Sequence, residues 1–195
     1  MTNEDDINEA LRKFNQNALL NKKRIDIENI VESLLLFFNN YFSILTNETT
    51  IKVMEFKNVN SDDPYKEIVS TLMSTFFNLV ENKIKEITVN NFNTIKNKIS
   101  KLTDIECNKE LSHVSQKITN EISDYYLTNA NDLVNELNKE DNNKNVSEYI
   151  LNIIYFKVIN TLKDRLMYSI KVIDNNYEEN NQKIESINEK TINKV

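Results

Sequence analysis

The chain contains no glycine, no tryptophan and only one proline among its 195 residues. Glycine is the residue that most readily adopts a positive φ, so tight hairpin turns would depend on asparagine or aspartate alone. Left-handed helix C-caps must likewise use asparagine or be absent. A genome of low GC content would give the same bias toward Asn, Lys and Ile, but a fold that survives without glycine must be one that needs none. The composition therefore argues against a many-stranded sheet.

The lack of glycine also excludes several kinds of nucleotide and hydrolase site. The P-loop, the Rossmann GxGxxG turn and the GxSxG nucleophile elbow each need backbone positions that only glycine occupies comfortably. None of the three can be written with the residues of this chain. The common nucleotide-binding folds are thus not expected here.

Histidine and cysteine each occur once, as His113 and Cys107. Glu110 and His113 match the Glu-x-x-His half of a ferritin-like di-iron site, but such a site needs that motif twice. Cys107 falls on an apolar stripe with Leu111, which favours a packed thiol over a nucleophile. We expect no catalytic residue, no metal and no cofactor, and hence a protein that is not an enzyme.

Charge and targeting signals limit the partners. The net charge is −6, and the cluster Lys22–Arg24 is too short to form a phosphate-binding stripe, so nucleic acid is not expected. Residues 82–101 contain five lysines and one glutamate, and we expect them to lie beside the acidic residues 174–190. The N-terminus has no basic or apolar leader, and one cysteine makes no intrachain disulfide. We expect a cytoplasmic or nuclear protein.

Helical periodicity dominates the chain. Apolar residues at spacings of three and four predict a short helix over 3–20 and a second from Asp26 through residue 45. Residues 46–63 break the pattern and predict an irregular segment. Asp62 or Asp63, followed by Pro64, predicts the start of a long helix that ends near residue 102. Two further helices follow, over residues 105–137 and from about 146 toward the C-terminus.

Helices joined by short turns pack antiparallel, and this rule predicts the architecture. The fold class is all-α, an elongated antiparallel bundle of four or five helices with a coiled-coil-like three-helix stalk. Residues 1–195 form a single helical unit. Residues 1–63 supply helices and an irregular segment that pack on a head, and residues 64–195 form three long antiparallel helices whose far tip holds residues 100–108.

The stretch VESLLLFFNNYFSIL, residues 31–45, is the most apolar in the chain and invites two interpretations. As a helix that is apolar nearly all round, it would form the core of the head. Alternatively, a membrane-active bundle would sequester this helix and release it at a bilayer. The segment is interrupted by Glu32, Asn39 and Asn40 and is shorter than the ~20 residues needed to span a bilayer.

The leading functional hypothesis is a non-enzymatic helical scaffold, tether or assembly subunit that acts through protein–protein interaction, including self-association. Long helices present extended grooves and seams to partner helices. The curved membrane-surface dimer that three long helices can form needs a basic concave face, and the net acidity counts against it. Packing within the chain is the alternative reading for every candidate contact. The candidates are Met54, Phe56, Val59, Tyr177, Ile184 and Ile187.

Overall fold

A computed structural model describes the backbone of residues 3–192, and the side chains of these residues other than 104, 174–181, 184 and 187–192. Almost all of this backbone is helical, and no strand occurs within the described range. The all-α prediction is confirmed. The elements are α1 (Asn3–Phe56), α2 (Tyr65–Lys98), the 3₁₀ turn η1 (Ile99–Lys101), α3 (Asp104–Leu137), α4 (Lys144–Glu148), the π-helical segment η2 (Tyr149–Ile154) and α5 (Tyr155–Ile192).

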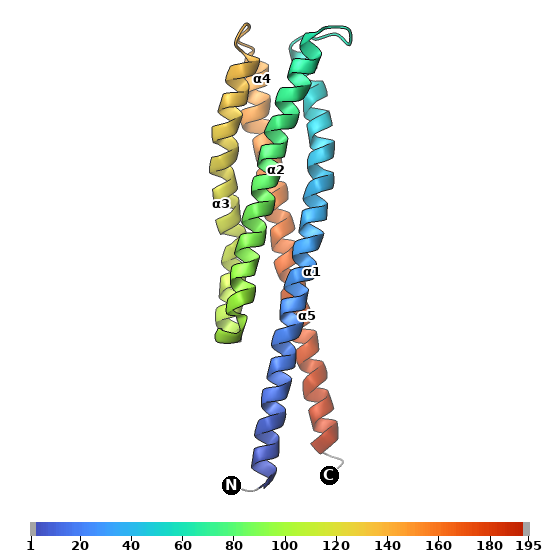
Figure 1. The fold of residues 1–195 in the computed structure, drawn as a ribbon, viewed down its shortest axis with the longest axis vertical. Coiled ribbons are helices and arrows are strands. Elements are labelled where there is room, and N and C mark those ends of the chain that lie inside the picture. Colours follow the sequence, from blue (N-terminus) through green and yellow to red (C-terminus); the bar gives the residue numbers. More distant parts are fainter. Residues whose placement is uncertain (1–2, 193–195) are drawn as a thin grey trace.

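The four long helices form an antiparallel bundle (Figure 1). Helix α1 packs against α2 and α5, and α3 packs against the same two helices, so α2 and α5 lie on a diagonal. The short segments α4 and η2 continue directly into α5, so the three together form the fourth rod of the bundle. The first and last described residues lie at one end of the molecule, and the loop after α1 and the loop after α3 lie at the other.

One side of the apolar stretch 31–45 lies in the bundle core, whereas the sequence predicts a helix that is buried nearly all round. Leu34, Phe38 and Phe42 are almost completely buried, and the rings of Phe42 and Phe77 of α2 are 6.2 Å apart. One face of the stretch stays exposed, because Leu36 is 66% accessible and points away from the other helices. Burial of the other apolar side chains is the main favourable contribution to packing, at about 25 cal/mol per Å² of apolar area.

The prediction of two separate helices before residue 46 is wrong, and so is that of an irregular segment over residues 46–56, whereas residues 57–63 are irregular as predicted. Helix α1 is continuous from Asn3 to Phe56. Its second half carries three threonines, which have a low helix propensity, but Thr46 and Thr50 each donate their hydroxyl to the carbonyl four residues earlier. Val53 is fully buried, so tertiary packing outweighs local propensity here.

The three-helix stalk is also wrong, because α1 runs beside the far tip of the α2–α3 hairpin. Lys96 of α2 forms an ion pair with Glu28 of α1 at 3.2 Å, and Lys23 of α1 donates to Asn108 of α3 at 3.4 Å. All four helices are therefore present as far as the hairpin tip. Beyond it, only the N-terminal part of α1 and the C-terminal part of α5 continue (Figure 1).

The described contacts of the α2 lysines lie within α2, α1 and α3; most acidic side chains of residues 174–190 lie outside the described side chains, so the pairing with them stays a prediction. Lys96 contacts Glu28, and Lys85 donates to Asn39 at 2.8 Å, so both reach to α1. Lys98 lies 4.0 Å from Glu110 of α3. Other partners lie in α2 itself, since Lys83 pairs with Glu86 at 3.4 Å and Lys85 with Glu81 at 2.9 Å.

The turns before α3 and α4 contain polar side chains that cap the helix starts. Thr103 and Glu106 form a capping box at the start of α3, in which each side chain accepts from the other residue's backbone N–H. Asn143 caps α4 by accepting from the N–H groups of Asn145 and Val146. The Asn143 amide also donates to the Phe56 carbonyl at 2.8 Å, which ties the end of α1 to the start of α4.

Candidate interaction surface

An exposed apolar stripe lies on the N-terminal part of α1. Ile7 is 58% accessible, Leu11 45% and Phe14 70%, and Ala18 and Ile25 are also exposed. These five residues, which we call the N-terminal stripe, follow one another at spacings of four, three, four and seven. Residues at such spacings share one face of a helix. The stripe is thus an apolar seam about 27 Å long at 1.5 Å per residue, interrupted by the polar Asn21 between Ala18 and Ile25.

The stripe faces away from the bundle core, as its last member shows. Ile25 is 49% accessible whereas Ile27 is 1% accessible, although the two are separated by one residue. Two positions along an α-helix correspond to about 200° of rotation, so these side chains point to opposite sides. The seam that includes Ile25 is therefore not a continuation of the core seam that includes Ile27 and Leu34.

The stripe is exposed because α1 is longer than its neighbours. Lys23, which is 2% accessible, and its contact with Asn108 mark the level at which the α2–α3 hairpin begins to cover α1. The residues before this level extend past the hairpin tip with only α5 running in the same region (Figure 1). A helix in this position is held at one end by the bundle and is open along the side that carries the stripe.

Charges divide the same segment into two halves. Residues 3–11 contain four acidic and no basic side chains, and residues 12–24 contain five basic and no acidic ones. Glu9, the last acidic residue of the first half, contacts Arg12 at 3.2 Å and Lys13 at 3.4 Å in the second. The hydrogen bond from Arg12 is the main cause that lowers the pKa of Glu9 below its usual value. The two halves are thus opposite in charge.

The candidates near the loop after α1 have a structural role. Met54 and Phe56 are partly buried against the core, and the Phe56 ring lies 5.6 Å from the ring of Tyr149. The Val59 N–H donates to the Met54 carbonyl at 2.9 Å and the Asn58 N–H to the Glu55 carbonyl at 3.2 Å. This is the bonding pattern of a Schellman motif, in which residues at the Met54 and Val59 positions frequently touch.

The remaining candidates, Tyr177, Ile184 and Ile187, belong to the C-terminal part of α5 and lie outside the described side chains. The structure does not bring them together with Met54, Phe56 or Val59, since the two groups belong to opposite ends of the rod (Figure 1). Whether either group binds a partner stays a prediction.

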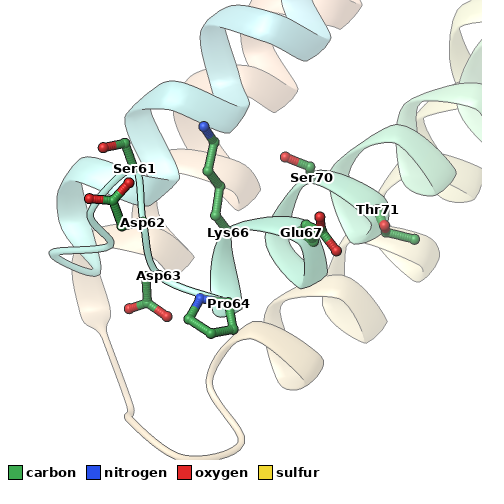
Figure 2. A pocket seen from close by; sticks show the side chains of 8 residues that line it. All are labelled: Ser61, Asp62, Asp63, Pro64, Lys66, Glu67, Ser70 and Thr71. Atoms are coloured by element: carbon green, nitrogen blue, oxygen red, sulfur yellow. The ribbon is translucent and has the colours of Figure 1, made fainter.

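A hollow of about 510 Å³ lies at the start of α2. Figure 2 shows that its side chains spread in several directions instead of converging on one point. Asp63 is used locally, because its carboxylate accepts from the Tyr65 N–H at 2.9 Å. The hollow is a product of the helix start and not a built site. Its lining residues are Ser61, Asp62, Asp63, Pro64, Lys66, Glu67, Ser70 and Thr71.

The single cysteine is packed, as its apolar stripe predicts, and the single histidine is exposed. Cys107 is 2% accessible within the core of α3, and His113 is exposed on the same helix. Among the described residues, no three His, Cys, Asp or Glu side chains are grouped so that they could hold a metal ion. No helix within the described range has the length and apolarity that a membrane span requires.

Comparison of the chain with protein-family models, with curated proteins and with solved structures finds no match. The geometry of the chain is therefore the basis for its functional interpretation. The sequence contained the signal for the stripe, namely the spacing of Ile7, Leu11 and Phe14, but the same spacing is typical of a buried helix face. The sequence could not reveal that neither α2 nor α3 covers this face of α1.

Proposed function

We propose that the chain is a non-enzymatic helical assembly subunit or tether that binds another protein through the N-terminal stripe of α1. The observation that carries the proposal is the exposure of Ile7, Leu11 and Phe14 on a helix held out from the bundle. Exposed apolar seams at spacings of three and four are the surfaces through which helices recognise partner helices and grooves. A contiguous exposed apolar surface of this kind marks an interaction site.

The shape of the molecule supports a role as a tether. Helix α1 alone is about 80 Å long at 1.5 Å per residue, and the bundle holds it straight along most of that length. A partner bound to the stripe would therefore be kept far from anything bound at the loop end. The single cysteine supports a reducing compartment, which we propose to be the cytoplasm or nucleus.

The proposal is tested by photo-crosslinking in the cells that make the protein. A photoreactive amino acid is placed at Leu11, on the stripe, or at Gln16, which is exposed on the other side of the same helix. We expect a crosslinked protein from position 11, none from position 16, and loss of the product when Phe14→Glu is added. Equal products from both positions, or none from position 11, would contradict the proposal.

The membrane-active alternative stays a prediction with its own test. Leu34, Phe38 and Phe42 are buried against neighbouring helices, so insertion of residues 31–45 into a bilayer would require the bundle to open. Dye leakage from neutral and anionic vesicles at pH 7 and pH 5 measures this directly. Leakage that needs the unaltered 31–45 segment would favour the alternative over the assembly role.

A further inference from the structure

We propose that the partner of the N-terminal stripe is the same stripe of a second copy of this chain, paired antiparallel in a short two-stranded coiled coil. This inference rests on the proposed function and names its partner. Four observations carry it: the heptad spacing of the stripe, the sizes of the side chains along it, the opposite charges of its two halves and its position at one end of the rod.

The stripe has the layer structure that an antiparallel pair requires. Ile7, Phe14 and Asn21 recur every seven residues, as do Leu11, Ala18 and Ile25. In an antiparallel coiled coil, a residue of one series faces a residue of the other, and knobs from each helix fill holes of its partner. When position 16 of the two copies lies at the same level along the pair, every layer joins one residue of each series.

Side-chain size fits the same register. In the central layers Phe14, the largest side chain of the stripe, faces Ala18, the smallest, of the second copy. Large and small side chains at facing positions interdigitate without a void or a clash. The outer layers place Ile7 against Ile25 of the second copy, and Leu11 against Asn21, which is exposed and keeps its amide at the edge of the seam.

The charges oppose the parallel orientation. In the antiparallel register the acidic residues 3–11 of one copy run beside residues 21–29 of the other, which carry three basic and two acidic side chains, although Asp5 and Glu9 lie on the side of the helix opposite the stripe. A parallel pair would place acidic side chains beside acidic ones and basic beside basic. Opposite charges at close range favour one partner orientation and like charges oppose the other.

The shape of the molecule leaves room for this pair. Because the stripe lies on a segment that extends past the hairpin tip, the second bundle would point away from the first and the two would be joined end to end (Figure 1). The segment is already helical and is held by the bundle, so pairing does not require it to fold. We expect a dissociation constant in the micromolar range, about 1–100 µM, because a short interface is typical of transient contacts.

Sedimentation velocity of the full chain across about 1–500 µM tests the pairing, a range that brackets the expected dissociation constant. The matched variants are Phe14→Glu, within the stripe, and Leu36→Glu, at a position of similar exposure on α1 outside it, 66% against 70%. We expect a monomer–dimer transition in the unaltered chain and in Leu36→Glu, and at least a tenfold weaker transition in Phe14→Glu. Circular dichroism of each variant checks that the helices are intact.

Disulfide formation tests the orientation. An equimolar mixture of Ile7→Cys and Ile25→Cys chains, distinguished by a mass tag on one of them, is oxidised at a concentration where the dimer forms. We expect the mixed disulfide as the main product, because an antiparallel pair brings these positions together and keeps two copies of Ile7→Cys about 27 Å apart. The unaltered chain is the control, since its Cys107 is 2% accessible. Dominant Ile7→Cys homodimers would overturn the antiparallel pair.

Failure of this inference can be told apart from failure of the proposed function. A chain that stays monomeric throughout, or a dimer that Phe14→Glu leaves unchanged, overturns the self-pairing. If photo-crosslinking at Leu11 still gives a different protein as the product, the proposed function stands with another partner. If the monomer instead sediments with phosphatidylcholine–phosphatidylserine vesicles through Phe14, both are overturned in favour of a membrane surface.

Discussion

Asn58 occupies a backbone conformation that glycine would normally adopt. It is the one residue in the described part of the chain with a positive φ, 53°. It closes the Schellman motif at the end of α1, and asparagine is the commonest substitute for glycine at this position. Its conformation explains how a chain without glycine ends its longest helix.

We expect Asn58→Gly to increase the free energy of unfolding by up to about 1 kcal/mol, and Asn58→Ala to decrease it by about 1 kcal/mol. Glycine has no Cβ to oppose the positive φ, whereas alanine has one and lacks the local hydrogen bonds of asparagine. Chemical denaturation of each variant gives the two values. Asn60→Gly, in the same loop, is the control and should lose stability, because positive φ within the described chain is confined to Asn58. Equal effects at the two positions would contradict this explanation.

Tyr126 contributes a buried hydroxyl that stabilises an irregular helical segment. The side chain is 0% accessible, and its hydroxyl donates to the Ile150 carbonyl at 2.8 Å. Ile150 lies in the π-helical segment η2, where the ordinary helical hydrogen bonds are shifted by one residue. Burial is the main cause that raises the pKa of Tyr126 well above its ordinary value of 10.0.

We expect Tyr126→Phe to decrease the free energy of unfolding by about 1–2 kcal/mol at pH 7, because a buried carbonyl loses its donor. Above pH 10 the unfolded chain releases the Tyr126 proton and the folded chain retains it, so the contribution of this tyrosine to stability declines. The difference between the variant and the unaltered chain should therefore narrow. Urea titrations at pH 7 and pH 11 measure it, and a constant difference would contradict the burial of an uncharged hydroxyl.

At the scale of elements, the sequence predicts the boundaries of α2 and α3 but not the continuity of α1. Asp63 and Pro64 mark the start of α2, and the change of register near Leu102 marks the turn before α3. These signals are local, since they depend on capping and on φ. The continuation of α1 through Thr46 and Thr50 could not be predicted, because it depends on the burial of Thr49 and Val53 by other helices.

The same limit applies to the interaction surface. The spacing of Ile7, Leu11 and Phe14 predicts an amphipathic helix, and the helix is there. The spacing does not say what covers the apolar face, because that depends on the relative lengths of α1, α2 and α3. Similarly, spacings of three and four from Cys107 and Leu111 onward predict Tyr125 on the apolar stripe of α3, whereas Tyr126 is the buried residue. A small rotation of the helix about its axis determines which of two adjacent residues is buried.

The turn between α2 and α3 is tested by Thr103→Ala. We expect the free energy of unfolding to fall by about 1 kcal/mol, because the Thr103 hydroxyl accepts from the Glu106 N–H and alanine cannot replace it. Thermal or urea unfolding followed by circular dichroism gives the value. Ser112→Ala is the control, since that exposed hydroxyl only donates to the Lys109 carbonyl within α3. A loss at Ser112 as large as that at Thr103 would contradict the capping role.

At the scale of the whole molecule, the bundle is a rod. Four antiparallel helices pack side by side, and α1 and α5 extend the rod beyond the hairpin tip (Figure 1). Small-angle scattering of a dilute sample should give a maximum dimension of at least about 80 Å, the length of α1. A compact chain of 195 residues would have a radius of gyration of about 16 Å. A value near 16 Å would mean that α1 is broken and folded back.

The antiparallel course of α1 and α5 from the shared end has a mechanical consequence. A force that separates the two ends of the chain acts across the helix pair at one point and would peel α1 from α5 layer by layer, beginning where α2 and α3 give no support. A force applied between the N-terminus and the loop after α3 pulls α1 and the rod formed by α4, η2 and α5 in opposite directions along their axes, so many layers must slide at once. The molecule is thus expected to yield easily to a pull at its paired ends and to resist a pull along its length.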